Sequence, residues 1–146
     1  MDNRKAVADY KKTLEDLKKL EVVVGLPKGK SDGTVIQYGA VHEFGAPERN
    51  IPRRSFLRVP TLNAENQIMR FAENQSKQLE KGVNATLFMG RIGAFIQGIV
   101  LKSFRENDWE ALKESTVKRK GSSAPLIDKG QLLQSITWDV RNASKS

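Results

Sequence analysis

The residues best suited to acid–base chemistry are His42 and Glu43, which are adjacent in the chain. An imidazole titrates near neutral pH, and a carboxylate can orient it or take its proton. Neighbouring residues of a helix or strand point apart, however, so these two cannot form one site alone. Because the chain has one histidine and no cysteine, a multi-histidine metal site, a thiolate site and a cysteine nucleophile are excluded.

A second candidate for chemistry is the glycine-rich stretch Gly25–Gly33, since glycine loops that follow a strand can hold phosphate. Its sequence, GLPKGKSDG, lacks the GK[ST] ending of a phosphate loop, so a surface loop is the better interpretation. No HExxH, GxSxG, Walker or Rossmann pattern occurs, and the carboxylates are scattered among lysines and arginines. We predict that the protein is not an enzyme and needs no cofactor or metal.

Positive charge is the strongest compositional signal. The 146 residues include 25 Lys and Arg against 17 Asp and Glu, a net charge of +8, which favours an acidic partner. The charge gathers in two clusters, Arg49, Arg53, Arg54 and Arg58, and Lys113, Lys118, Arg119 and Lys120. Such clusters suit the phosphates of DNA and the carboxylates of a protein interface equally well, so both kinds of partner stay open.

The periodicity of apolar residues predicts an α+β fold, with amphipathic helices on a small, mostly antiparallel sheet. We expect one domain over residues 1–146, with an N-terminal helix over 1–20, projecting loops at 27–33 and 45–60, and a frayed tail at 142–146. The other expected helices are Thr34–Phe44 (capped by Thr34, with part of a strand as the alternative), Thr61–Lys81, Ala85–Arg105 and Gly130–Ser135, and the expected strands are Glu21–Leu26 and Ile136–Val140.

The helix Ala85–Arg105 has the widest apolar face, which includes Phe95 and Ile99, so it should lie at the centre of the core. Gly90, Ala94 and Gly98, four residues apart, would let another backbone approach it closely. The apolar run Leu87–Leu101 is shorter than the roughly 20 residues that a membrane crossing needs. Together with a charged N-terminus, this predicts a soluble protein made in the cytoplasm, with no membrane partner.

Two sequence blocks resemble a family of tailed-bacteriophage neck and tail-completion proteins. The first block is HEFGAP at 42–47 followed by IPRRSFLR at 51–58, where the family pattern is HEFG, a polar loop and IPARPFLR. The second block is PLIDKGQLLQSI at 125–136, which follows Trp109 and is similar to the family's PLIDTGxLxxSI. The residues that carry the likeness are His42, Phe44, Gly45, Pro52, Phe56, Leu57, Trp109, Leu126, Asp128 and Gly130.

The resemblance implies a structural virion protein that completes or terminates a phage tail or joins it to the head connector. It would act as a homo-oligomeric ring, a hexamer or dodecamer, around the DNA channel, with tail-tube or connector proteins as partners and possible contact with DNA. A basic DNA-contacting module in virion assembly is the alternative. Candidate interface residues are Glu43, Arg49, Arg53, Arg54, Arg58, Lys118, Arg119 and Lys120.

Physical reasoning gives each part of the first block a role. A proline-stiffened arginine loop loses little entropy on docking, which suits an assembly protein. We expect the loop's arginines to face partners, and Phe44, Phe56 and Leu57 to belong to the core. Gly45 should have a positive φ or a close backbone contact. Trp109 and Trp138 are expected to cover the core.

Overall fold

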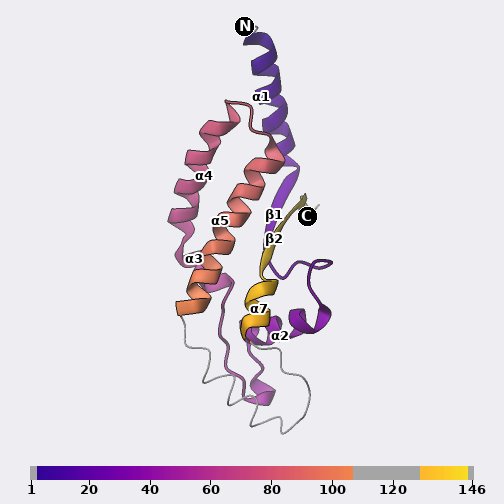
Figure 1. Cartoon of the computed structure of the whole chain (residues 1–146), viewed down its shortest axis with the longest axis vertical. Coiled ribbons are helices and arrows are strands. Elements are labelled where there is room, and N and C mark those ends of the chain that lie inside the picture. The colour runs from indigo at the N-terminus through magenta and orange to yellow at the C-terminus, as the bar shows by residue number, and fades with distance from the viewer. Residues whose placement is uncertain (1–2, 107–128, 145–146) are drawn as a thin grey trace.

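The computed structural model describes residues 3–106 and 129–144. The elements are α1 (Asn3–Lys18), β1 (Leu20–Gly25), α2 (Gly33–Phe44), the 3-10 turn η1 (Pro47–Arg49), α3 (Arg58–Asn63), α4 (Glu65–Leu79), α5 (Ala85–Glu106), α7 (Lys129–Ser135) and β2 (Thr137–Asn142). Helices dominate, and the two strands pair antiparallel, so the α+β prediction is confirmed. Figure 1 shows α4 and α5 as an antiparallel pair beside the two strands, with α1 extending beyond them.

The two-stranded sheet joins an early and a late part of the chain. Val22 pairs with Val140 and Val24 with Trp138, which puts these apolar side chains on one face of the sheet. That face packs against α5, where a Cβ added to Gly93 would lie 2.7 Å from Val22 Cγ2. The sheet depends on this contact, since two strands alone are marginally stable in water.

The core lies at the lower end of α5, where α2, α7 and the segment before α3 meet. Its members are Val35, Phe56, Val100, Phe104, Leu132 and Ile136, each at most 2% exposed. The rings of Phe56 and Phe104 meet edge to face, with centroids 5.6 Å apart. The segment that carries the first family-like block is thus anchored in the centre of the core.

The structure corrects the predicted start of α2 and the extent of two loops. Asp32 caps α2 by accepting a 2.7 Å hydrogen bond from the Thr34 amide, so Thr34 is not the cap. Loop 27–33 folds back on β2, because the Lys30 ammonium contacts the Asp139 carboxylate and the Trp138 carbonyl oxygen.

The expected helix over 61–81 is two helices, and the first begins inside the predicted loop 45–60. α3 starts at Arg58 and ends at Asn63, and α4 follows from Glu65. Pro60 fits in the first turn of α3, because amides there have no partner within the helix. The predicted frayed tail is also shorter, because Asn142 belongs to β2 and the Ala143 amide donates to Lys19.

Helix α5 occupies the central position that its apolar face predicts, but its packing differs in detail. The Trp138 ring covers Gly90 and Gly93, whereas a Cβ on Gly98 would meet nothing within 4 Å. Phe95 is half-buried and stacks on Phe71 of α4, with ring centroids 4.1 Å apart.

By length and composition alone, α5 is also able to cross a membrane, contrary to the length argument made from the sequence. Its 22 residues pack against both strands and against α1, α3 and α4. Those contacts are of the kind that a central helix makes within a folded domain.

Candidate functional site

The Glu43 carboxylate binds residues 55–58 of the first family-like block. Its side chain is 6% exposed at the end of α2 and reaches the segment that leads into α3. Oε2 accepts hydrogen bonds from the backbone amides of Phe56 and Leu57, at 2.9 and 3.0 Å. Oε1 accepts from the Ser55 hydroxyl at 2.7 Å and from the Arg58 amide at 3.1 Å. Glu43 is therefore a structural acceptor, and its assignment to the partner interface is wrong.

Ser55 completes this arrangement at the start of α3. Its hydroxyl oxygen accepts a hydrogen bond from the Val59 amide at 3.0 Å while its proton goes to Glu43. A helix start leaves several amides without partners, and here Glu43 and Ser55 together satisfy those of residues 56–59. The pattern that this block resembles has proline at the position of Ser55, and a proline side chain has no acceptor.

Gly45 ends α2 as predicted. Its φ of 74° lies in the region that favours glycine, and its amide donates to the Val41 carbonyl at 2.7 Å. A Cβ at this position would lie 2.8 Å from the backbone nitrogen of Arg53. Both features expected of Gly45, the positive φ and the close backbone contact, are confirmed.

Beyond Gly45 the chain makes a compact hairpin. Ala46 and Ile51 form a two-way backbone bridge, with N–O distances of 2.9 and 3.0 Å. Asn50 takes a left-handed conformation, with φ 56°, that closes the turn η1. Arg49 and Pro52 are exposed on this hairpin, so the arginine is displayed by an ordered backbone.

His42 lies beside this segment with 6% of its surface exposed. Its ring meets Tyr38 edge to face, and its carbonyl oxygen accepts a 2.7 Å hydrogen bond from the Arg54 amide. Burial, and secondly the positive charge of Arg54, lower the pKa of His42 to about 4. The imidazole is therefore neutral at physiological pH and helps to seat the arginine segment in the fold.

The arginines and the apolar residues of the first family-like block differ in their exposure to solvent. Arg49, Arg53 and Arg58 are exposed and Arg54 is half-buried, as a partner-facing cluster requires. Phe56 is 1% exposed and Leu57 is half-buried, so both turn inward as expected. Phe44 does not, because 70% of its surface is exposed. Its assignment to the core is wrong, and it becomes a surface aromatic next to the arginine segment.

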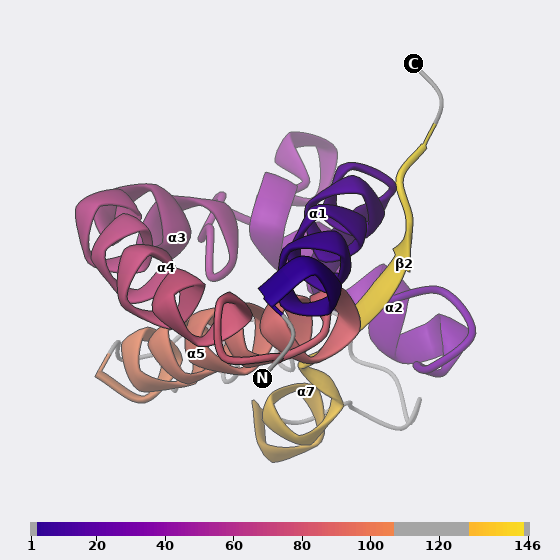
Figure 2. The same cartoon turned by 90° about the horizontal axis from the view of Figure 1, so that it is seen from above.

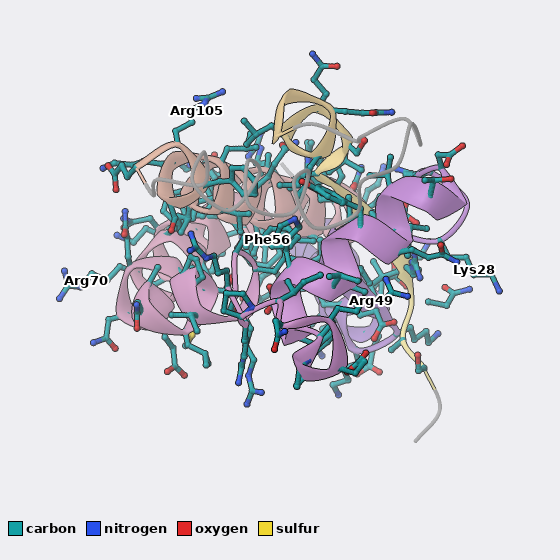
Figure 3. The ribbon with its side chains drawn as sticks, turned by 90° about the horizontal axis from the view of Figure 1, so that it is seen from below. Lys28, Arg49, Phe56, Arg70 and Arg105 are labelled. Carbon is teal, nitrogen blue, oxygen red and sulfur yellow. The ribbon has the colours of Figure 1, made fainter. Side chains whose placement is uncertain are left out.

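Three further exposed basic side chains lie on other elements of the fold. Seen from below, Phe56 lies near the middle, while Lys28, Arg70 and Arg105 lie towards the periphery (Figure 3). They come from the loop after β1, from α4 and from the end of α5, so no local sequence pattern linked them to the arginine loop. Exposed positive charge is therefore not confined to the arginine segment.

The second family-like block is described only in part. Lys118, Arg119, Lys120, Trp109, Leu126 and Asp128 lie outside the described residues. Gly130 is exposed within α7. Leu132 and Ile136 of the same block are 1% and 2% exposed and join Phe56 in the core, so the two blocks meet in space.

The exposed side chains of this segment are basic and aromatic, namely Arg49, Arg53, Arg58 and Phe44. The Glu43 carboxylate accepts hydrogen bonds from four donors, and His42 is 6% exposed. Within residues 3–106 and 129–144, no group of three or more His, Cys, Asp or Glu side chains could hold a metal ion. Comparisons with family models, curated proteins and solved structures find no match for the chain.

Proposed function

We propose that this chain is a structural virion protein of a tailed bacteriophage, acting at the head-proximal end of the tail. The observation that carries the proposal is the Glu43 carboxylate, which holds residues 55–58 while Arg49, Arg53 and Arg58 face outward. This explains physically why a motif of the HEFG and IPxRxFLR kind would stay together: the glutamate of the first part binds the backbone of the second.

The arrangement fits protein–protein joining. A loop fixed before binding loses little entropy on docking. Arginine and aromatic residues are enriched at protein interfaces, and the site offers three exposed arginines and the exposed Phe44. We therefore assign it to the completion or termination of the tail, or to its joining to the head connector. Its partners would be copies of itself in a hexameric or dodecameric ring, and tail-tube or connector proteins.

A second candidate function, DNA contact during virion assembly, is favoured by the net charge of +8 and by the exposed arginines. In a ring around the DNA channel, the same arginines would face the lumen. Joining is the better proposal, because Phe44 adds apolar surface that phosphate binding does not use.

A triple variant, Arg49→Ala, Arg53→Ala and Arg58→Ala, tests the proposal and separates the two candidates. All three side chains are exposed, so folding stability should change by less than about 0.5 kcal/mol per site. The joining proposal predicts that the variant folds, that it fails to support assembly of tailed particles, and that duplex DNA binding is weak before and after the change.

A charge-matched control is Lys77→Ala, Lys81→Ala and Lys102→Ala, which removes three exposed charges elsewhere and should leave assembly intact. If the wild type binds duplex DNA tightly with a steep salt dependence, and only the arginine variant loses that binding while tailed particles still form, DNA contact replaces joining.

A further inference from the structure

The two-stranded sheet has two outer edges, and the hydrogen bonds of the ladder show which backbone groups point outward. The Ala143 amide donates to the Lys19 carbonyl at 2.8 Å, which makes residues 19 and 143 a hydrogen-bonded pair. Such pairs alternate along an antiparallel ladder. Because Glu21 stands opposite Arg141 and Val23 opposite Asp139, the backbone groups of Glu21 and Val23 bond to β2. The N–H and C=O groups of Val22 and of Val24 therefore point away from β2, and those of Val140 and Asn142 point away from β1.

The outer edge of β1 is open to pairing. In the described part of the chain, no hydrogen bond from another element reaches the backbone of Val22 or Val24. The strand reads LEVVVG, which is rich in β-branched residues and has no lysine or proline to discourage a further strand. An edge of this kind is a template for strand addition.

The outer edge of β2 is protected at one end only. Lys30 covers its beginning, donating to the Trp138 carbonyl oxygen at 3.2 Å and pairing with Asp139. Its second half, Val140–Asn142, receives no such cover in the described residues. Figure 2 shows this end of β2 leading away from the helices, where a neighbouring molecule can reach it.

The two open edges complement each other. On the face towards α5, both strands carry apolar residues, Val22 on β1 and Val140 on β2. On the opposite face, β1 carries Glu21 and β2 carries Arg141, which stand opposite each other within one chain. Pairing of β1 with β2 of a second copy in the same register repeats this apolar match and this opposite-charge pair.

We propose that β1 of one copy pairs antiparallel with the Val140–Asn142 half of β2 of the next copy, giving a sheet that continues between subunits. The contact joins two different surfaces, so it is heterologous and can close into a ring. This inference rests on the proposed function for its ring, but it names an interface that can be tested without phage particles.

Disulfide trapping tests the interface in the full chain, which has no native cysteine. Glu21→Cys and Arg141→Cys are made in separate proteins of different size and are mixed under mild oxidation. We expect a mixed dimer at least tenfold more abundant than in a control mixture of Glu21→Cys with Lys77→Cys, a position on α4. Equal yields in the two mixtures, or a predominance of 21–21 dimers, would overturn the proposal.

Proline substitution supplies a second measurement. Asn142→Pro removes an outward amide from an exposed position, whereas Ala143→Pro removes the inward amide that donates to Lys19. In backgrounds carrying Arg141→Cys, we expect the first proline to abolish the mixed dimer at an unchanged melting temperature. The second should preserve trapping despite a weaker intrachain ladder. Trapping that survives Asn142→Pro contradicts the proposal.

Different experimental results would refute the strand pairing and the proposed virion role. If rings form in assembled particles but show no 21–141 trapping, the edge-to-edge pairing is wrong and the virion role stands. If trapping is specific but loss of the protein leaves phage particles normal, the pairing stands as self-association and the virion role is wrong.

Discussion

The Oε2 atom of Glu43 lies 2.9 Å from the backbone nitrogen of Phe56, a residue in the centre of the core. This bond ties the end of α2 to the start of α3 across the arginine hairpin. The buried glutamate thereby fixes where the exposed arginines stand, and the stability and the proposed function of the segment depend on it together.

Replacement of Glu43 should therefore destabilise the fold. Glu43→Gln replaces one acceptor oxygen with an NH2 group, which is a donor. This group faces either the amides of Phe56 and Leu57 or the Arg58 amide and the Ser55 hydroxyl. We expect the free energy of unfolding to fall by about 2–3 kcal/mol. Glu43→Ala leaves all four donors without this acceptor and should cost about 3–5 kcal/mol. Urea unfolding measures both, with the exposed Glu48→Gln as the control expected to change little. Surface substitutions usually change the free energy of unfolding by no more than about 0.5 kcal/mol. A change this small for Glu43→Ala would refute the structural role of Glu43.

Gly45 gives a test of backbone conformation. Gly45→Ala places a Cβ 2.8 Å from the Arg53 nitrogen at a φ of 74°, so we expect a loss of about 2 kcal/mol or more. Gly98→Ala is the matched control, because its Cβ meets nothing within 4 Å in α5 and should stabilise the helix by about 0.5–1 kcal/mol. Thermal melts that rank the two variants in the opposite order would contradict the structure.

The pKa of His42 predicts a pH dependence of stability. Because the folded-state pKa, about 4, lies below the unfolded value of 6.5, the unfolded chain binds the extra proton first. Stability contributed by the neutral imidazole is present above pH 6.5 and is lost as the pH falls towards 4. Between pH 7 and 5 we expect a loss of about 1–2 kcal/mol.

His42→Gln removes the titrating group and serves as the comparison. Unfolding free energies measured at pH 7, 6 and 5 should fall more steeply for the wild type than for this variant. Parallel curves for the two proteins would mean that His42 is not buried in its neutral form.

The aromatic core offers a further pair of measurements. Phe56 is 1% exposed, so Phe56→Ala should cost about 3–5 kcal/mol. Phe95 is half-buried and stacked on Phe71, so Phe95→Ala should cost about 2 kcal/mol, less than full burial would give. A double-mutant cycle between Phe71 and Phe95 should give a coupling of about 0.5–1.5 kcal/mol. Equal losses of unfolding free energy for Phe56→Ala and Phe95→Ala would contradict the difference in burial between the two residues.

Elements with strong local patterns could be predicted from the sequence. The wide apolar face of α5 and the alternation in β2 led to the right element types, because both signals come from residues close in sequence. The start of α3 did not follow from local pattern, because Glu43 reaches Arg58 from 15 residues away. A proline-rich segment that would otherwise be a loop becomes helical at its end once an external acceptor satisfies its amides.

The site was predicted in part for a similar reason. On α2 the buried positions are Val35, Gly39, His42 and Glu43, which form one helical stripe. Phe44 lies outside that stripe, so its hydrophobicity was a poor guide, and the polar pair took the interior places. Exposure of the arginines followed from charge alone.

Electron microscopy of particles made in a phage-infected culture that lacks this protein is the most direct test of the central claim, a structural role at the head-proximal end of the tail. We expect separated heads and tails or tails of excessive length, and normal particles again when the wild-type chain is supplied. Supply of the Arg49, Arg53 and Arg58 triple alanine variant should leave the defect in place. Normal, infectious tailed particles in the absence of the protein would show that it has no such structural role.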